Sequence, residues 1–143
     1  MQLRSLLLSI VFALIGLFTN AQSAGNITLN VHHRGAEKGF IMVALYKSED
    51  GFPNDPQKAI LQLKEATKSK ITTIRIQSIP FGNYAIAVFH DANSDGKINY
   101  NLLGAPTEAY GFSNNARKMF SAPSFKEAMF RHAGETNLKI DIK

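Results

Sequence analysis

Asn-Ile-Thr-Leu-Asn-Val, residues 26–31, alternates polar and apolar side chains at every step. Successive side chains of a β-strand point to opposite faces, so this period of two predicts a strand with one buried and one solvated face. The same alternation returns at residues 137–142, near the other end of the chain. A strand at each end of the sequence favours a sheet-based fold.

The residues between these two segments predict further strands. Residues 40–46 are apolar throughout, which is typical of a strand that is covered on both sides. Residues 71–79 and 84–89 flank Pro80-Phe81-Gly82-Asn83, whose proline and glycine favour a turn, so they are expected to form a hairpin. We therefore predict a mostly β domain, a single sandwich of about seven strands.

One or two short helices are expected to interrupt the strands. Asp55-Pro56 would cap and begin a helix that runs to about Ala66, although residues 60–63 could equally form a strand. Ser124 and Glu127 have the spacing of a capping box ahead of an apolar stretch, which predicts a second helix.

Residues 1–21 have the features of a secretory signal peptide. They combine a basic start, an apolar run at 6–18, and small residues, Thr19 and Ala21, ahead of a cleavage site. That run is shorter than the ~20 apolar residues of a transmembrane helix, so no membrane span is expected after cleavage. The sandwich domain would then occupy residues 22–143, in the periplasm or outside the cell. The chain has no cysteine and hence no disulfides.

Composition also limits the possible functions. The formal net charge is +5, but the lysines and arginines are dispersed and not interleaved with aromatics, which argues against nucleic-acid binding. The sequence holds no nucleophilic cysteine, no Gly-x-Ser-x-Gly motif and no phosphate-binding glycine loop, so no catalytic residue is predicted. His32 and His33 are adjacent in a strand, so they point to opposite faces and cannot chelate together; both are expected at the surface or at an edge.

Recognisable chemistry is concentrated at residues 91–101. Calcium loops of the EF-hand type take side-chain oxygens from positions 1, 3 and 5 and a main-chain carbonyl from position 7, with a glycine at position 6 for the sharp turn. Counting from Asp91, Gly96 occupies position 6. The predicted calcium ligands are Asp91, Asn93, Asp95, Lys97 through its carbonyl, Asn99 and Glu108.

This loop is not a complete EF-hand. Leu102 stands at position 12, where the bidentate glutamate belongs, and a strand rather than a helix precedes the loop. Glu108 or Asn101 must therefore fold back to close the site, and the expected affinity is weak, on the order of 10⁻⁴–10⁻³ M. The alternative is a tight turn at residues 93–96 without metal, because Asn, Asp and Gly favour positive φ.

Three separated motifs point to a known family. They are PFGNYAIAVFHD at 80–91, GAPTEAYGFSNN at 104–115 and PSFKEA at 123–128. Together they resemble the bacterial domain of unknown function 2141 over essentially the whole mature chain. The resemblance implies an exported, uncharacterised protein with an immunoglobulin-like or transthyretin-like sandwich, and it supplies no established activity.

The segment after Glu108 offers a second candidate site. Aromatic faces and amides suit contacts with sugars or peptides; the candidates are Tyr110, Phe112, Ser113 and Asn114. Alternatively, the aromatics fill the core and the polar residues make a turn. The predicted function is a non-enzymatic exported module that binds a protein or carbohydrate of the cell envelope and has a calcium-ordered loop. The alternative is a metal-dependent hydrolase that uses the carboxylates of Asp91, Asp95 and Glu108.

Overall fold

The structure is a computed structural model that describes residues 23–34 and 38–143. Within these residues it has eight strands in two sheets and only short helical segments. The expected mostly β fold is therefore confirmed, with eight strands instead of about seven. The predicted signal peptide, residues 1–21, lies outside the described residues.

The smaller sheet has three strands in the order β4-β1-β8. Its central strand, β1 (Ala24–His32), contains the alternating stretch that predicted the fold. β1 pairs antiparallel with β4 (Ile71–Pro80) and parallel with β8 (Thr136–Asp141). The two period-two segments from opposite ends of the chain are thus neighbours in one sheet.

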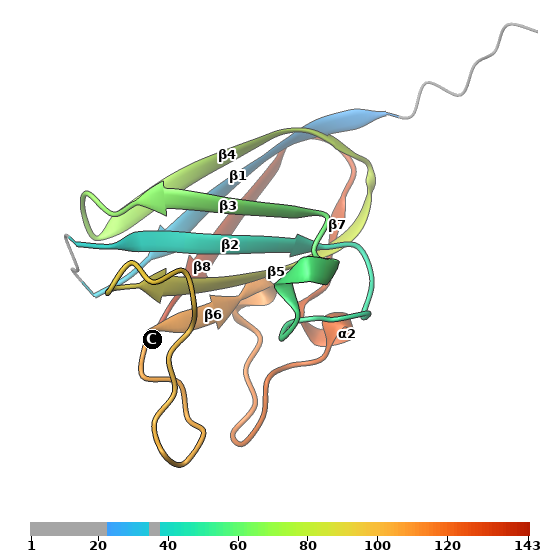
Figure 1. The fold of residues 1–143 in the computed structure, drawn as a ribbon. Coiled ribbons are helices and arrows are strands. Elements are labelled where there is room, and N and C mark those ends of the chain that lie inside the picture. Colours follow the sequence, from blue (N-terminus) through green and yellow to red (C-terminus); the bar gives the residue numbers. More distant parts are fainter. Residues whose placement is uncertain (1–22, 35–37) are drawn as a thin grey trace, which may run out of the picture.

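The larger sheet is built around one long strand, β5 (Gly82–Asp91). One edge of β5 pairs with β2 (Phe40–Tyr46), which in turn pairs with β3 (Leu61–Ala66). The other edge pairs with two short strands, β6 (Tyr110–Phe112) and β7 (Phe130–His132). Figure 1 shows the two sheets as two layers. The helical segments are η2 (Pro56–Lys58), η3 (Ser113–Asn115) and α2 (Phe125–Ala128).

The core lies between the two layers. Ile27, Leu29 and Val31 of β1 are completely buried, as their alternation predicted, and they belong to one cluster with Ile41 of β2 and Ile86 of β5. The sheets also meet at an edge. There, Tyr110 and Lys143 exchange two main-chain hydrogen bonds of 3.2 Å each.

The predicted hairpin at residues 71–89 is wrong. β4 lies in the smaller sheet and β5 in the larger one, so the turn at Phe81 carries the chain between layers. The side chain of Tyr84, 1% exposed, holds this crossing: its hydroxyl donates a 2.8 Å hydrogen bond to the carbonyl oxygen of Pro80. Burial raises the pKa of Tyr84, which keeps the hydroxyl a donor. A tyrosine of this kind marks the corners of immunoglobulin-type sandwiches.

The two helix predictions have opposite outcomes. The helix from Asp55 to Ala66 is wrong: only the turn η2 forms after Asp55, and residues 61–66 are strand β3, because their alternating side chains pair with β2. The capping box is confirmed. Ser124 and Glu127 make the reciprocal bonds at the start of the one-turn helix α2, and the hydrogen bonds from Ser124 lower the pKa of Glu127 to about 2.

His33 lies inside the molecule and not at the surface, which corrects the expectation for this residue. Its side chain is only 7% exposed, stacks on His90 with the ring centroids 5.9 Å apart, and bonds to Thr72 Oγ1 through Nε2 at 3.2 Å. Its Nδ1 is buried and, among the described residues, has no hydrogen-bond partner. Burial, and then the neighbouring His90 and His32, lower the pKa of His33.

Removing the hydroxyl that spans the sheet crossing should destabilise the fold. We expect Tyr84→Phe to lower the free energy of unfolding by roughly 1 kcal/mol, the usual net value of one buried hydrogen bond. Urea denaturation followed by circular dichroism measures the change. Tyr100→Phe is the matched control, because Tyr100 is 55% exposed and should leave stability unaltered. An equal effect of both variants would contradict the role given to Tyr84.

The lowered pKa of His33 predicts a pH-dependent stability. Below pH ~6.5, the unfolded chain protonates this imidazole more readily than the folded chain does, so the free energy of unfolding should fall as the pH drops from 7 towards 5.5. Urea titrations at several pH values measure this slope. His33→Gln should reduce it, and a slope that is unchanged in this variant would contradict the prediction.

Candidate functional site

The acidic loop, residues 91–108, begins where β5 ends. Asp91, the last residue of that strand, is fully buried. Its Oδ1 accepts a hydrogen bond from Asp95 N at 3.1 Å, and its Oδ2 accepts one from Gly96 N at 2.9 Å. The chain can wrap this tightly because Ser94 and Gly96 both have positive φ, 65° and 77°. One carboxylate thus fixes the first turn of the loop.

Asp95 stands at the centre of the loop. Its Oδ2 accepts bonds from the side-chain amides of Asn93 at 2.9 Å and Asn99 at 3.0 Å, and its Oδ1 accepts a bond from Lys97 N at 2.8 Å. The hydrogen bond from Asn99, followed by those from Lys97 N and Asn93, lowers the pKa of Asp95. The carboxylate therefore stays ionised at neutral and mildly acidic pH.

Glu108 folds back and closes the loop, whereas Asn101 does not. The two carboxylate oxygens of Glu108 accept bonds from Ala92 N and Asn99 N, both at 3.0 Å. Asn101 Oδ1 instead accepts bonds from Leu103 N and Ala105 N at the far tip of the loop. In the described residues, three side chains of the predicted calcium ligands, Asn93, Asp95 and Asn99, are hydrogen-bonded to one another. The carboxylates of Asp91 and Glu108 bond instead to main-chain N–H groups of the same loop, and Lys97 was expected to act through its carbonyl.

The acidic loop has an unbalanced charge. In the part of the chain that the structure describes, none of the ion pairs involves Asp91, Asp95 or Glu108. The same part holds no group of three or more His, Cys, Asp or Glu side chains arranged to bind a metal ion. Any cation would thus depend on the asparagine and main-chain oxygens as well as on the carboxylates.

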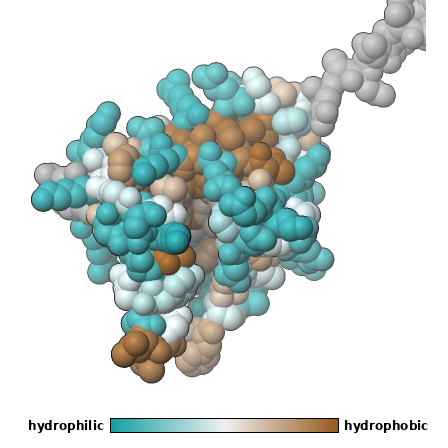
Figure 2. All heavy atoms as spheres, viewed as in Figure 1, coloured by the Kyte–Doolittle hydropathy of each residue, from teal (hydrophilic) through white to brown (hydrophobic). Residues whose placement is uncertain are grey.

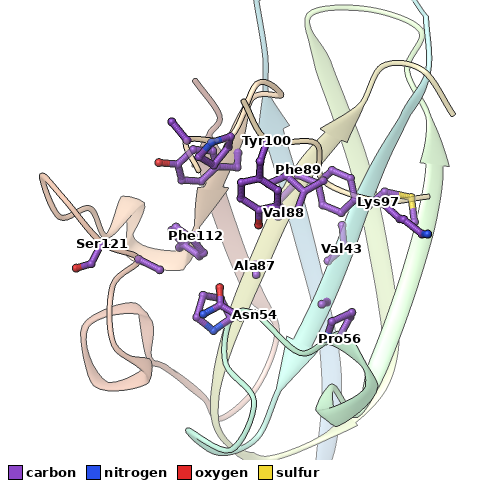
Figure 3. Close-up of a pocket in the computed structure, with 18 of the residues that line it drawn as sticks. Val43, Asn54, Pro56, Ala87, Val88, Phe89, Lys97, Tyr100, Phe112 and Ser121 are labelled. Atoms are coloured by element: carbon purple, nitrogen blue, oxygen red, sulfur yellow. The ribbon is translucent and has the colours of Figure 1, made fainter. Parts of the chain in front are cut away.

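A groove of about 810 Å³ lies beside the acidic loop, on the outer face of the larger sheet. Met42 and Ala44 of β2 line it together with Ala87 and Phe89 of β5. Figure 3 shows Ala87 and Phe89 among the residues around the groove. Contrary to expectation, β2 is therefore not covered on both sides along its whole length: Met42 and Ala44 on its outer face line the groove and are half-exposed, while Tyr46 at its end is buried. This volume lies within the roughly 300–1,000 Å³ of small-molecule sites.

Two loops wall this groove, and the connection between β2 and β3 adds Pro53, Asn54 and Pro56 to its border. The acidic loop contributes Gly96, Lys97 and Ile98 near its start and Tyr100 and Leu103 farther along. The opposite wall is the second loop, residues 116–123, which contributes Lys118 through Ala122. The acidic loop and the groove are thus parts of one site.

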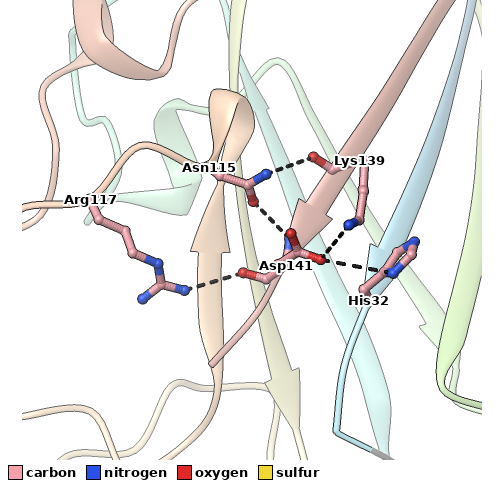
Figure 4. A network of polar contacts seen from close by, with 5 residues as sticks. All are labelled: His32, Asn115, Arg117, Lys139 and Asp141. Atoms are coloured by element: carbon pink, nitrogen blue, oxygen red, sulfur yellow. Dashed lines mark hydrogen bonds and ion pairs between the residues drawn. The ribbon is translucent and has the colours of Figure 1, made fainter.

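The base of the second loop is tied to both sheets. Arg117 donates to the carbonyl oxygens of Tyr110 at 3.3 Å and Asp141 at 3.2 Å, and Asn115 Oδ1 accepts a 2.8 Å bond from Asp141 N (Figure 4). The carboxylate of Asp141 in turn lies 3.2 Å from Lys139 Nζ. These contacts hold one groove wall at a defined place on the sandwich.

The predicted ligand-binding residues separate into two pairs. Tyr110 and Phe112 line the groove. Ser113 is fully buried, where its hydroxyl accepts a 2.9 Å bond from Ile86 N and donates to Ala128 O. Asn114 donates to Met129 O at 2.8 Å. The polar pair therefore positions the segment that follows β6. Of the aromatic pair, Tyr110 is half-buried at the groove, whereas Phe112 is only 6% exposed and packs in a hydrophobic cluster with Ala85 and Ala128, as the alternative expected.

Sequence patterns missed most of the groove. Its floor comes from the outer faces of β2 and β5, and the second loop was not singled out at all. The sequence of β2 did contain a signal for the groove. Its residues are apolar on both faces of the strand, and those on the outer face need a covering that the neighbouring residues in sequence do not supply. Met119 and Phe120 were a second signal, because they are large apolar residues inside a loop.

Comparison with known proteins gives a family but no relative of known activity. No curated protein matches the chain, and no solved structure does. One family model, described as an uncharacterised protein conserved in bacteria, matches residues 29–141, which span the strands from β1 to β8. The chain therefore belongs to the bacterial domain of unknown function 2141 family.

Proposed function

We propose that this protein is an exported, non-catalytic binding module of the cell envelope whose groove takes a protein or carbohydrate ligand. In this proposal, calcium orders the acidic loop. The observation that carries it is the shared wall: Gly96, Lys97 and Ile98 belong to the acidic loop and also line the groove. An ion that fixed this loop would thereby fix one side of the ligand site.

The donor set of the acidic loop fits a hard cation. Calcium takes six to eight oxygens from carboxylates, amides, carbonyls and water. Asp95 Oδ2 accepts hydrogen bonds from two side-chain amides, those of Asn93 and Asn99. A side-chain amide carries an oxygen opposite its nitrogen, so rotating these amides would present oxygens where they now present N–H groups. A cation could then replace the two donors.

The hydrogen bonds favour a structural role over a catalytic one. A catalytic metal needs an open coordination position and a free acid or base nearby. Both carboxylate oxygens of Asp91 and both of Glu108 instead accept bonds from main-chain N–H groups. Those bonds shape the loop, and they support the binding module in preference to the hydrolase, which stays an alternative prediction.

Calcium should stabilise the folded protein. With a Kd on the order of 1 mM, about 10 mM calcium adds roughly 1.4 kcal/mol to the free energy of unfolding, because the ion binds only the folded loop. The midpoint of thermal unfolding should then rise by roughly 3–6 °C relative to EDTA. Magnesium should give a smaller rise, since it dehydrates reluctantly and demands stricter geometry. Differential scanning calorimetry measures all three conditions.

Two alanine variants localise this effect. Asp95→Ala removes the central carboxylate and should abolish the calcium-dependent rise. Asp50→Ala is the matched control: its carboxylate pairs with Lys58 outside the acidic loop, so the rise should persist. The absence of a rise in the natural protein, or an equal rise in Asp95→Ala, would refute calcium binding at this loop.

A further inference from the structure

Two apolar tips project from the same side of the molecule. One is Leu102-Leu103 at the end of the acidic loop, and the other is Met119-Phe120 at the end of the second loop. Their exposed fractions run from 87% for Met119 to 105% for Leu102. Both loops wall the same groove, and Figure 2 shows hydrophobic surface at the ends of two projections on that side. Two exposed apolar pairs beside one groove indicate an interaction surface, whereas single apolar residues scattered over a surface need no such explanation.

The leucine tip is a rigid turn. Asn101 N donates to Ala105 O at 2.9 Å, and Gly104 N donates to Asn101 O at 3.0 Å. The side chain of Asn101 accepts two further bonds, from Leu103 N and Ala105 N. Main-chain groups that enter an apolar medium need internal partners. This turn supplies partners for the N–H groups of Asn101, Leu103, Gly104 and Ala105 while both leucines stay exposed, which lowers the cost of taking the tip out of water.

The residues next to the tips in sequence carry only basic charges, because the carboxylates of the acidic loop, Asp91, Asp95 and Glu108, lie nearer to its two ends than to its tip. No aspartate or glutamate occurs at residues 96–107 or at 109–126. The same stretches hold Lys97, Arg117, Lys118 and Lys126. Lys118 is paired with Glu127 at 3.0 Å, while Lys97 lies on the groove wall. An apolar tip with cations behind it complements a surface that is apolar inside and anionic at its rim.

We propose that the two tips insert into the interfacial region of an anionic lipid bilayer and attach the protein peripherally. No helix in the described residues is long and apolar enough to cross a membrane. Two interactions bind peripheral proteins to such surfaces: apolar side chains are buried at the acyl boundary, and basic residues are attracted to the anionic headgroups. This goes beyond the proposed function and does not require calcium.

Vesicle flotation in EDTA tests the proposal on the protein purified after export. The vesicles are phosphatidylethanolamine with phosphatidylglycerol, and phosphatidylcholine alone serves as the neutral comparison. Binding should favour the anionic vesicles and weaken as salt rises. Leu102→Ser with Leu103→Ser, or Met119→Ser with Phe120→Ser, should each weaken partitioning by about tenfold or more. All variants have the same N-terminus, so a difference in partitioning between them is due to the substitutions at the tips.

Control variants exclude a general effect of lost hydrophobicity. Ile60→Ser with Ile71→Ser removes two half-exposed apolar residues away from the tips and should leave partitioning unchanged. Because the chain has no tryptophan, Phe120→Trp gives a single tryptophan, which can be excited selectively over the four tyrosines. Its emission should shift to the blue on anionic vesicles, and that of Ile71→Trp should not.

Three outcomes would overturn the proposal. The first is no binding to anionic vesicles. The second is binding that survives both pairs of serine substitutions. The third is self-association that depends on the tips, seen by analytical ultracentrifugation without vesicles, which would assign the tips to a second copy of the chain. Because calcium is absent throughout, a failure here leaves the calcium-ordered loop untouched, and a failure of calcium binding leaves lipid docking untouched.

Discussion

Strand β5 is the element on which the rest of the molecule depends. It pairs with β2 along one edge and with β6 and β7 along the other. Its inner face fills the core between the sheets, and its outer face lies under the groove. The strand begins just after the crossing that Tyr84 holds and ends at Asp91, the residue that fixes the acidic loop. Fold and candidate site therefore share one piece of backbone.

The acidic loop is fixed at its base by carboxylates that accept main-chain N–H groups. Asp91 wraps its first turn, and Glu108 brings its end back to its beginning. These bonds make a compact loop without a metal, but they leave its negative charge without an ion-pair partner among the described residues. The amides of Asn93 and Asn99 hold its centre and are also the groups a cation would reorient. The turn is thus compatible with the proposed metal site, because its main-chain bonds would form the framework of that site.

The sequence patterns predicted the features that depend on residues close together in the chain. The alternation at residues 26–31 predicted a buried face, and the capping box at Ser124 predicted the start of α2. The spacing from Asp91 to Glu108 predicted a loop that Glu108 closes by folding back, and its carboxylate does bond to Ala92 N and Asn99 N. Errors arose where partners are distant in sequence. The Pro80–Asn83 turn joins two sheets and not two paired strands, because the packing of the core places β4 and β5 in different layers. The groove, in turn, forms only where two loops flank the outer face of β2.

The central claim, that the acidic loop and the groove respond to calcium as one unit, is tested most directly by two-dimensional NMR of the labelled protein during a calcium titration. The account predicts saturable shifts of the Asp95, Gly96 and Lys97 amides, accompanied by shifts at Ala87 and Tyr110 in the groove. Both sets should give the same midpoint. Shifts confined to exposed carboxylates elsewhere, or no shift of the Gly96 amide, would contradict it.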